Sequence, residues 1–174
     1  MANIQKLSRD QRLKMSIEEM AFSNIKWLIS KNKISIFKEL NSLLQNTKNH
    51  EVRNTTAKIL FSLEHKTSLK AFINAIKQPR TKNNRGYLVL CCAAFDCSSY
   101  LLVFIDLVLT DAYYTTTNAI MIIEEMKGPF KTSHYNKAIN KMNIFLEKNR
   151  DDEKFYLVKD LLKFLLNSSQ HNLC

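Results

Sequence analysis

Few side chains in this sequence have the types and spacing that catalysis or metal binding requires. The four histidines are isolated, and none forms a His-Glu-x-x-His motif. Cys91 and Cys92 are neighbours on a predicted helix, so their side chains diverge by about 100° and are poorly placed to share a metal ion. The acidic pairs Glu18-Glu19 and Glu124-Glu125 diverge in the same way, which favours solvated surface over acid–base catalysis. We therefore expect no enzymatic activity, no cofactor and no metal.

A basic segment is the sharpest polar feature of the chain. Residues 65–95 contain no Asp or Glu, and a basic turn is predicted at 77–85. Such a turn can contact phosphates or an acidic protein, or it can be an ordinary solvated turn. Aromatic residues do not alternate with its basic ones, which argues against a single-strand-binding site. The basic residues of the predicted partner-binding surface are Lys66, Lys70, Lys77, Arg80, Lys82 and Arg85.

Glycine and proline, two of each in 174 residues, are unusually scarce. Sheet proteins use both in their many turns, and phosphate-binding loops need glycine where the backbone approaches the ligand. This composition argues against β-rich folds, P-loops and Rossmann folds. Since 45% of the residues are hydrophobic, the chain can bury a core. We expect a single all-α domain over residues 1–174.

Helical periodicity accounts for most of the chain, and no segment alternates as a strand would. Pro79 and the pair Gly128-Pro129 are expected to end helices. The acidic residues 151–153 are expected in the first turn of the last helix, where the helix dipole favours them. The predicted helices are 8–23 (which 24–30 either continues or follows as a short turn), 35–45, 51–64, 67–77, 83–95, 98–110, 113–127, 133–148 and 151–166.

Two segments repeat when the sequence is shifted by 32 residues. Arg53 then falls on Arg85, and Phe72 falls on Phe104. Each copy predicts a helix, a short turn and a second helix, and a third, degraded copy begins near Tyr113. The clearest repeats are 51–82, 83–112 and 113–148.

The first copy resembles a HEAT-like repeat. The residues that carry this resemblance are Glu51, Val52, Arg53, Ala57, Leu60, Leu63, Leu69, Phe72 and Ile76. Residues 83–110 resemble it too, although Val89 stands where that family usually has a small residue. The resemblance implies a right-handed α-solenoid that binds other macromolecules, here with about four helical hairpins plus a C-terminal capping helix. An irregular helical bundle is the alternative.

Comparison of the two copies adds further residues to the predicted partner-binding surface. Asp106 interrupts an apolar run, and its counterpart in the first copy is the polar Asn74. Asn74 and Asp106 either line a binding face or occupy ordinary outward-facing positions. Leucines replace Lys70 and Lys77 in the second copy, which indicates an apolar patch. The added residues are Asn74, Tyr100, Leu102, Asp106 and Leu109, and residues 98–110 are also a possible homo-oligomer contact.

The net charge of +10 is unevenly distributed along the chain. Residues 86–126 contain five acidic residues and no Lys or Arg, whereas the segments on both sides are basic. The first twelve residues lack the apolar core of a signal peptide, and Asp96 and Asp106 argue against a membrane span at 86–110. Three of the four cysteines crowd into this apolar segment, as reduced core thiols would. We expect a cytoplasmic protein without a membrane partner.

These features favour a non-catalytic module that binds another protein with an acidic surface, as an adaptor or an inhibitor of the immunity-protein type. Nucleic-acid binding through a basic face is the alternative. A DNA-glycosylase-like enzyme is less favoured, and its candidate residues would be Trp27, Tyr113 and Tyr114 with Asp106 or Asp111.

Overall fold

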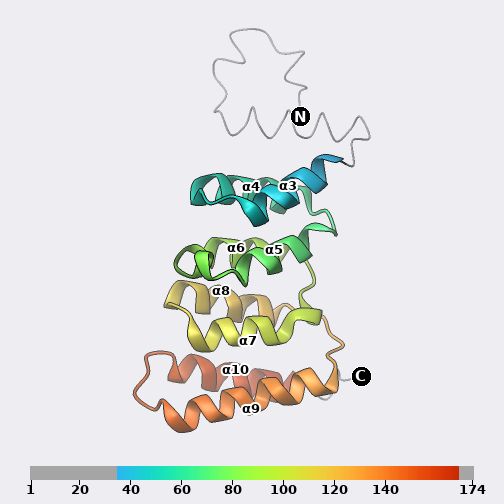
Figure 1. The fold of residues 1–174 in the computed structure, drawn as a ribbon. Helices are drawn as coiled ribbons and strands as arrows, with labels where there is room; N and C mark the ends of the chain where they lie inside the picture. Colours follow the sequence, from blue (N-terminus) through green and yellow to red (C-terminus); the bar gives the residue numbers. More distant parts are fainter. Residues whose placement is uncertain (1–34, 169–174) are drawn as a thin grey trace, which may run out of the picture. The chain divides into compact units, whose positions relative to one another are not determined.

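The computed structural model describes residues 35–168 of the chain. These residues form eight α-helices and three short 3-10 segments, without a strand, which confirms the predicted all-α class for this part. The helices predicted at 8–23 and 24–30, Trp27 and Cys174 lie outside the described residues. The elements are α3 (Ser35–Asn46), α4 (His50–Leu63), α5 (Ser68–Ile76), η2 (Pro79–Asn84), α6 (Gly86–Leu90), η3 (Cys91–Ala94), η4 (Ser98–Tyr100), α7 (Leu101–Thr110), α8 (Tyr113–Glu124), α9 (Thr132–Lys148) and α10 (Phe155–Ser168) (Figure 1).

The chain divides into two compact units, Met1–Ala71 and Phe72–Cys174, with the boundary inside α5. In the first unit α3 packs against α4. In the second unit α7 packs against both α8 and α9, α8 also packs against α6, and α9 packs against α10 (Figure 1). Each unit has buried apolar side chains of its own. The expected single domain and the repeat boundaries stay predictions.

The ends of α4 follow from the residues that flank it. Asn49 Oδ1 accepts hydrogen bonds from the backbone N–H groups of Glu51 (2.9 Å) and Val52 (3.2 Å), which have no partner within the helix. At the other end Glu64 takes a left-handed conformation, with φ 48°, and its N–H bonds back into the last turn. The helix therefore lies within one residue of the predicted 51–64.

The apolar run of α7 makes this helix the centre of the second unit. Leu101, Phe104, Ile105 and Val108 recur at helical spacing, and all four are fully buried. Burial of side chains of this size stabilises a fold by about 1.5–3 kcal/mol each. The residues between them, including Leu102 and Asp106, are held at fixed positions on the other side of the helix.

The prediction of one continuous helix over 83–95 is wrong. Pro79 begins the 3-10 segment η2, and the buried Thr81 hydroxyl lies 2.8 Å from the carbonyl oxygens of Ala75 and Gln78. These contacts tie η2 to the end of α5, so a new α-helix begins only at Gly86. This helix ends at Leu90, where the 3-10 segment η3 follows. The residues past Lys77 are thus a structured connection.

The acidic residues 151–153 precede the last helix instead of forming its first turn, because α10 begins at Phe155. Asp152 Oδ1 accepts a hydrogen bond of 2.8 Å from the Lys154 N–H, which closes a local turn. Pro79 lies just beyond the end of α5, as expected, and α8 ends at Glu124, ahead of Gly128-Pro129. Within residues 35–168, every helix is too short or too polar to cross a bilayer.

Gly86 allows α6 and α8 to approach closely at their first turns. A Cβ atom at this position would lie 2.5 Å from Tyr114 Cδ1 and 3.1 Å from Thr115 Oγ1. The approach brings Asn118 Nδ2 to 3.1 Å from the Gly86 carbonyl oxygen, to which it donates a hydrogen bond. Glycine is therefore required by contact between helices.

We expect Gly86→Ala to lower the free energy of unfolding by about 1 kcal/mol, because the new methyl group overlaps the Tyr114 ring. In a Tyr114→Ala background the overlap is removed and alanine favours the helix, so the same change should be neutral or stabilising. Urea denaturation of the four proteins measures this coupling. An equal loss in both backgrounds would contradict the contact.

Candidate functional site

A groove beside α7 brings together several of the predicted partner-binding residues. Its volume is about 320 Å³, and it lies between the C-terminal end of α5 and the outer side of α7. Half-buried leucine and valine side chains form its apolar part, and charged side chains stand at its rim. The lining residues are Ile76, Lys77, Arg85, Leu102, Val103, Asp106, Leu107 and Thr110.

Arg85 is held at this groove by a buried ion pair with Asp111. Its Nε donates to Asp111 Oδ1 at 2.7 Å, and its Nη2 donates to Asp111 Oδ2. A third bond, of 3.0 Å, runs from Nη1 to the Ile76 carbonyl oxygen at the end of α5. The Asp111 side chain is 1% exposed and that of Arg85 is 13% exposed. Since its donors are engaged, the guanidinium group shapes one wall of the groove.

Lys154 joins the same cluster from the turn before α10. Its buried ammonium group donates to the carbonyl oxygens of Leu109 (3.0 Å) and Asp111 (3.3 Å). Cations at the C-terminal end of a helix are favoured by the helix dipole, and these carbonyls lie at the end of α7. Arg85, Asp111 and Lys154 therefore connect the α5–α6, α7–α8 and α9–α10 turns at one end of the second unit (Figure 1).

Asp106 forms an exposed ion pair that crosses from α7 to α9. Its carboxylate accepts from Lys141 Nζ, and the two side chains are 53% and 44% exposed. Thr110, one turn further along α7, donates its hydroxyl hydrogen to the Asp106 carbonyl oxygen at 2.7 Å. The aspartate is thus an outward residue with a partner, and its negative charge at the groove is compensated by Lys141.

The structure gathers some of the eleven predicted residues and leaves others apart. Lys77, Arg85, Leu102 and Asp106 share the groove. Arg80 and Lys82 are exposed on η2, and Asn74 is exposed on α5. Tyr100 and Leu109 are half-buried outside the groove lining, and Lys66 and Lys70 are exposed within the first unit.

Sequence reasoning missed several contributors to this site, among them Val103, Lys141 and Lys154. Val103 lines the groove beside Leu102, and the comparison of the two repeats did not identify it. Lys141 and Lys154 come from the third repeat and beyond, where each forms a contact with the α7 segment. The acidic, lysine-free middle of the chain was the available signal, because its aspartates must find cations elsewhere.

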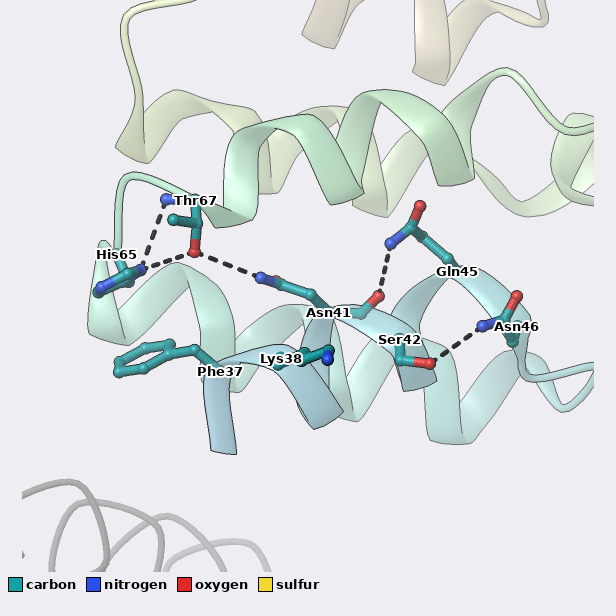
Figure 2. A pocket seen from close by; sticks show the side chains of 8 residues that line it. All are labelled: Phe37, Lys38, Asn41, Ser42, Gln45, Asn46, His65 and Thr67. Atoms are coloured by element: carbon teal, nitrogen blue, oxygen red, sulfur yellow. Dashed lines mark hydrogen bonds between the residues drawn. The ribbon is translucent and has the colours of Figure 1, made fainter. Parts of the chain in front are cut away.

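A second hollow lies within the first unit, on α3 and the turn after α4. Its volume is about 460 Å³, and Figure 2 shows the eight side chains that line it: Phe37, Lys38, Asn41, Ser42, Gln45, Asn46, His65 and Thr67. The His65 ring stacks on Phe37, with ring centres 4.0 Å apart. His65 Nδ1 lies 2.8 Å from Thr67 Oγ1, which accepts a 3.4 Å hydrogen bond from Asn41 Nδ2 (Figure 2). These contacts hold His65 in a fixed orientation.

The three cysteines within residues 35–168 are buried thiols. Cys91, Cys92 and Cys97 are free and buried, as expected of core residues. Burial raises the pKa of the Cys91 thiol to about 12, against the weaker, opposite effect of a hydrogen bond with Tyr87. A hydrogen bond with Cys97, together with burial, raises the pKa of Cys92. Across residues 35–168, no three His, Cys, Asp or Glu side chains gather as metal ligands.

Comparisons of the chain with protein-family models, curated proteins and solved structures found no match.

We expect Asp111→Ala to lower the free energy of unfolding by about 3 kcal/mol, because it leaves the Arg85 guanidinium buried without a counter-charge. The matched control is Asp106→Ala, which removes the exposed pair with Lys141 and should cost less than about 1 kcal/mol. Guanidinium or urea denaturation measures both values. Similar losses in the two variants would contradict the conclusion that the buried pair contributes more to stability than the exposed pair.

We expect Cys91 to resist iodoacetamide in the folded protein at about pH 8.5, since a pKa of about 12 leaves little reactive thiolate. The unfolded thiol ionises near 9.0, so stability should fall as pH rises between 9.0 and about 12. Mass spectrometry of labelled peptides, compared with protein in urea, gives the rates. Equal labelling of Cys91 in both states would refute its burial.

Proposed function

We propose that this protein is a non-catalytic binding module that holds a segment of another protein in the groove beside α7. The observation that carries the proposal is the composition of the groove: half-buried Leu102 and Val103 lie next to the exposed Lys77. Apolar side chains with a charge at the rim are the usual composition of a protein–protein contact. The occupant that fits is an apolar segment flanked by acidic residues, from an adaptor's client or an inhibitor's target.

The charges of the groove support an acidic partner. Arg85 is engaged with Asp111, and Asp106 is compensated by Lys141. Lys77 is exposed and has no ion pair within residues 35–168. The remaining positive charge would therefore meet a carboxylate at the edge of the apolar contact. Polar groups already fixed in mutual contacts are suited to holding a partner in register.

A right-handed HEAT-like solenoid belongs to the same proposal. Its support is the packing in the second unit, where α7 contacts α8 and α9, and α8 contacts α6. Helices that touch their neighbours along a stack leave one surface of the stack open to a partner. An irregular helical bundle remains the alternative. The reduced state of Cys91, Cys92 and Cys97 fits a cytoplasmic location, where thiols are kept reduced.

Site-specific photocrosslinking tests the groove. A photoreactive residue at Val103 should crosslink to a partner segment that contains acidic residues, whereas the same residue at the exposed Lys137 of α9 should not. Leu102→Lys and Lys77→Glu should each weaken capture of that partner by about tenfold or more, with circular dichroism unchanged.

The matched control is Lys137→Glu, which makes the same charge change outside the groove. Partner capture that survives both groove variants would exclude this site. The double variant Leu102→Lys, Leu109→Lys tests the other use of this surface, which is self-association through residues 98–110. Sedimentation velocity should show a change in mass only if copies of this chain occupy the surface.

A further inference from the structure

The α5–α6 turn carries exposed basic side chains, and the start of α8, which packs against α6, carries exposed aromatic ones. Arg80 and Lys82 are exposed on η2, and no Asp or Glu occurs between residues 65 and 95. Tyr113 and Tyr114, which open α8, are each 56% exposed. We call these four residues the tyrosine–basic patch. Exposed aromatic rings offer apolar faces that a partner can cover.

Three contacts hold the end of the α5–α6 turn and the start of α6 against the start of α8. Arg85, which ends the basic turn, bonds to Asp111, two residues before Tyr113. Gly86 lies so close to Tyr114 that a Cβ there would be 2.5 Å from Cδ1. Asn118 of α8 bonds to the Gly86 carbonyl oxygen at 3.1 Å. Tyr113 and Tyr114 are distant from the basic turn in the sequence, so alternation along the chain could not associate them with it.

The charged side chains of the α5–α6 turn are all positive. The carboxylate of Asp111 is buried and neutralised by Arg85. Lys82 has no ion pair within the described range, and the Nε of Arg80 donates to Gln78 at 2.6 Å, which orients its guanidinium group. The acidic residues 151–153 belong to the α9–α10 turn, and Lys154 joins this turn to the Asp111 carbonyl oxygen.

We propose that the tyrosine–basic patch binds a single-stranded nucleic acid. The tyrosine rings would each offer a face on which a base can stack, and Arg80 and Lys82 would contact the phosphates. Each group in the patch then has a role. An acidic protein would satisfy the cations but leave the rings exposed, and a duplex would keep its bases stacked within itself. This site is separate from the groove beside α7.

The test uses the full-length protein and fluorescein-labelled oligothymidylate and oligouridylate of about twelve nucleotides. Fluorescence anisotropy at several salt concentrations gives the affinity and its salt dependence. Tyr113→Leu and Tyr114→Leu should each weaken single-strand binding by about fivefold or more, whereas Tyr113→Phe and Tyr114→Phe should retain it, because stacking needs the ring. Arg80→Gln with Lys82→Gln should reduce the slope of log K against log salt by about 1.4.

Matched controls change the same residue types elsewhere. Tyr156 is 73% exposed near the acidic turn, so Tyr156→Leu should leave binding unchanged. Lys137→Gln with Lys159→Gln removes two exposed charges and should leave the salt slope unchanged. Three results would each overturn the proposal: no single-strand binding at low salt, equal binding of a duplex of the same length, or leucine variants that bind like the wild type. Tighter binding of polyglutamate than of either oligonucleotide would assign the patch to an acidic protein instead.

Discussion

The buried contact between Arg85 and Asp111 is the interaction on which the second unit depends. A charged pair can be buried only if each donor and acceptor finds a partner, and here the guanidinium group also reaches the Ile76 carbonyl oxygen. Lys154 adds a second cation at the carbonyl oxygens of Leu109 and Asp111. The helix connections of this unit are therefore held by hydrogen bonds, while the apolar core sets the distances between the helices. The groove beside α7 and the tyrosine–basic patch both border this cluster.

The sequence predicted most helices of the described part because helical periodicity is a local property. The 51–64 and 133–148 helices lie within one residue of α4 and α9. The error at 83–95 has a local cause, since the Thr81 hydroxyl bonds to the carbonyl oxygens of Ala75 and Gln78 just before it, and the next helix begins only at Gly86. Apolar periodicity cannot reveal such a contact, because the residues that decide it are polar.

The site was less predictable than the fold. Comparison of the repeats identified Leu102 and Asp106, which line one groove. It could do so because equivalent positions in successive repeats have similar surroundings. It could not show that Arg85 turns inward to Asp111, since a basic residue in a turn has the same sequence signature whether it is solvated or paired. Nor could it join Tyr114 to the basic turn. That neighbourhood exists because glycine at 86 lets two helices approach, and a missing side chain gives no positive signal.

The buried ammonium group of Lys154 has a consequence for how the end of this unit opens. A helix that packs mainly against one neighbour, as α10 does against α9, normally opens first, because few contacts hold it. Here withdrawal of the turn before α10 would take the Lys154 cation away from the carbonyl oxygens of Leu109 and Asp111, of which the Asp111 oxygen would keep the Thr116 hydroxyl as a donor. Those carbonyls adjoin Asp111, the partner of Arg85, so the loss would reach the α5–α6 turn as well. Local unfolding at this end should therefore involve all three turns as one cooperative unit.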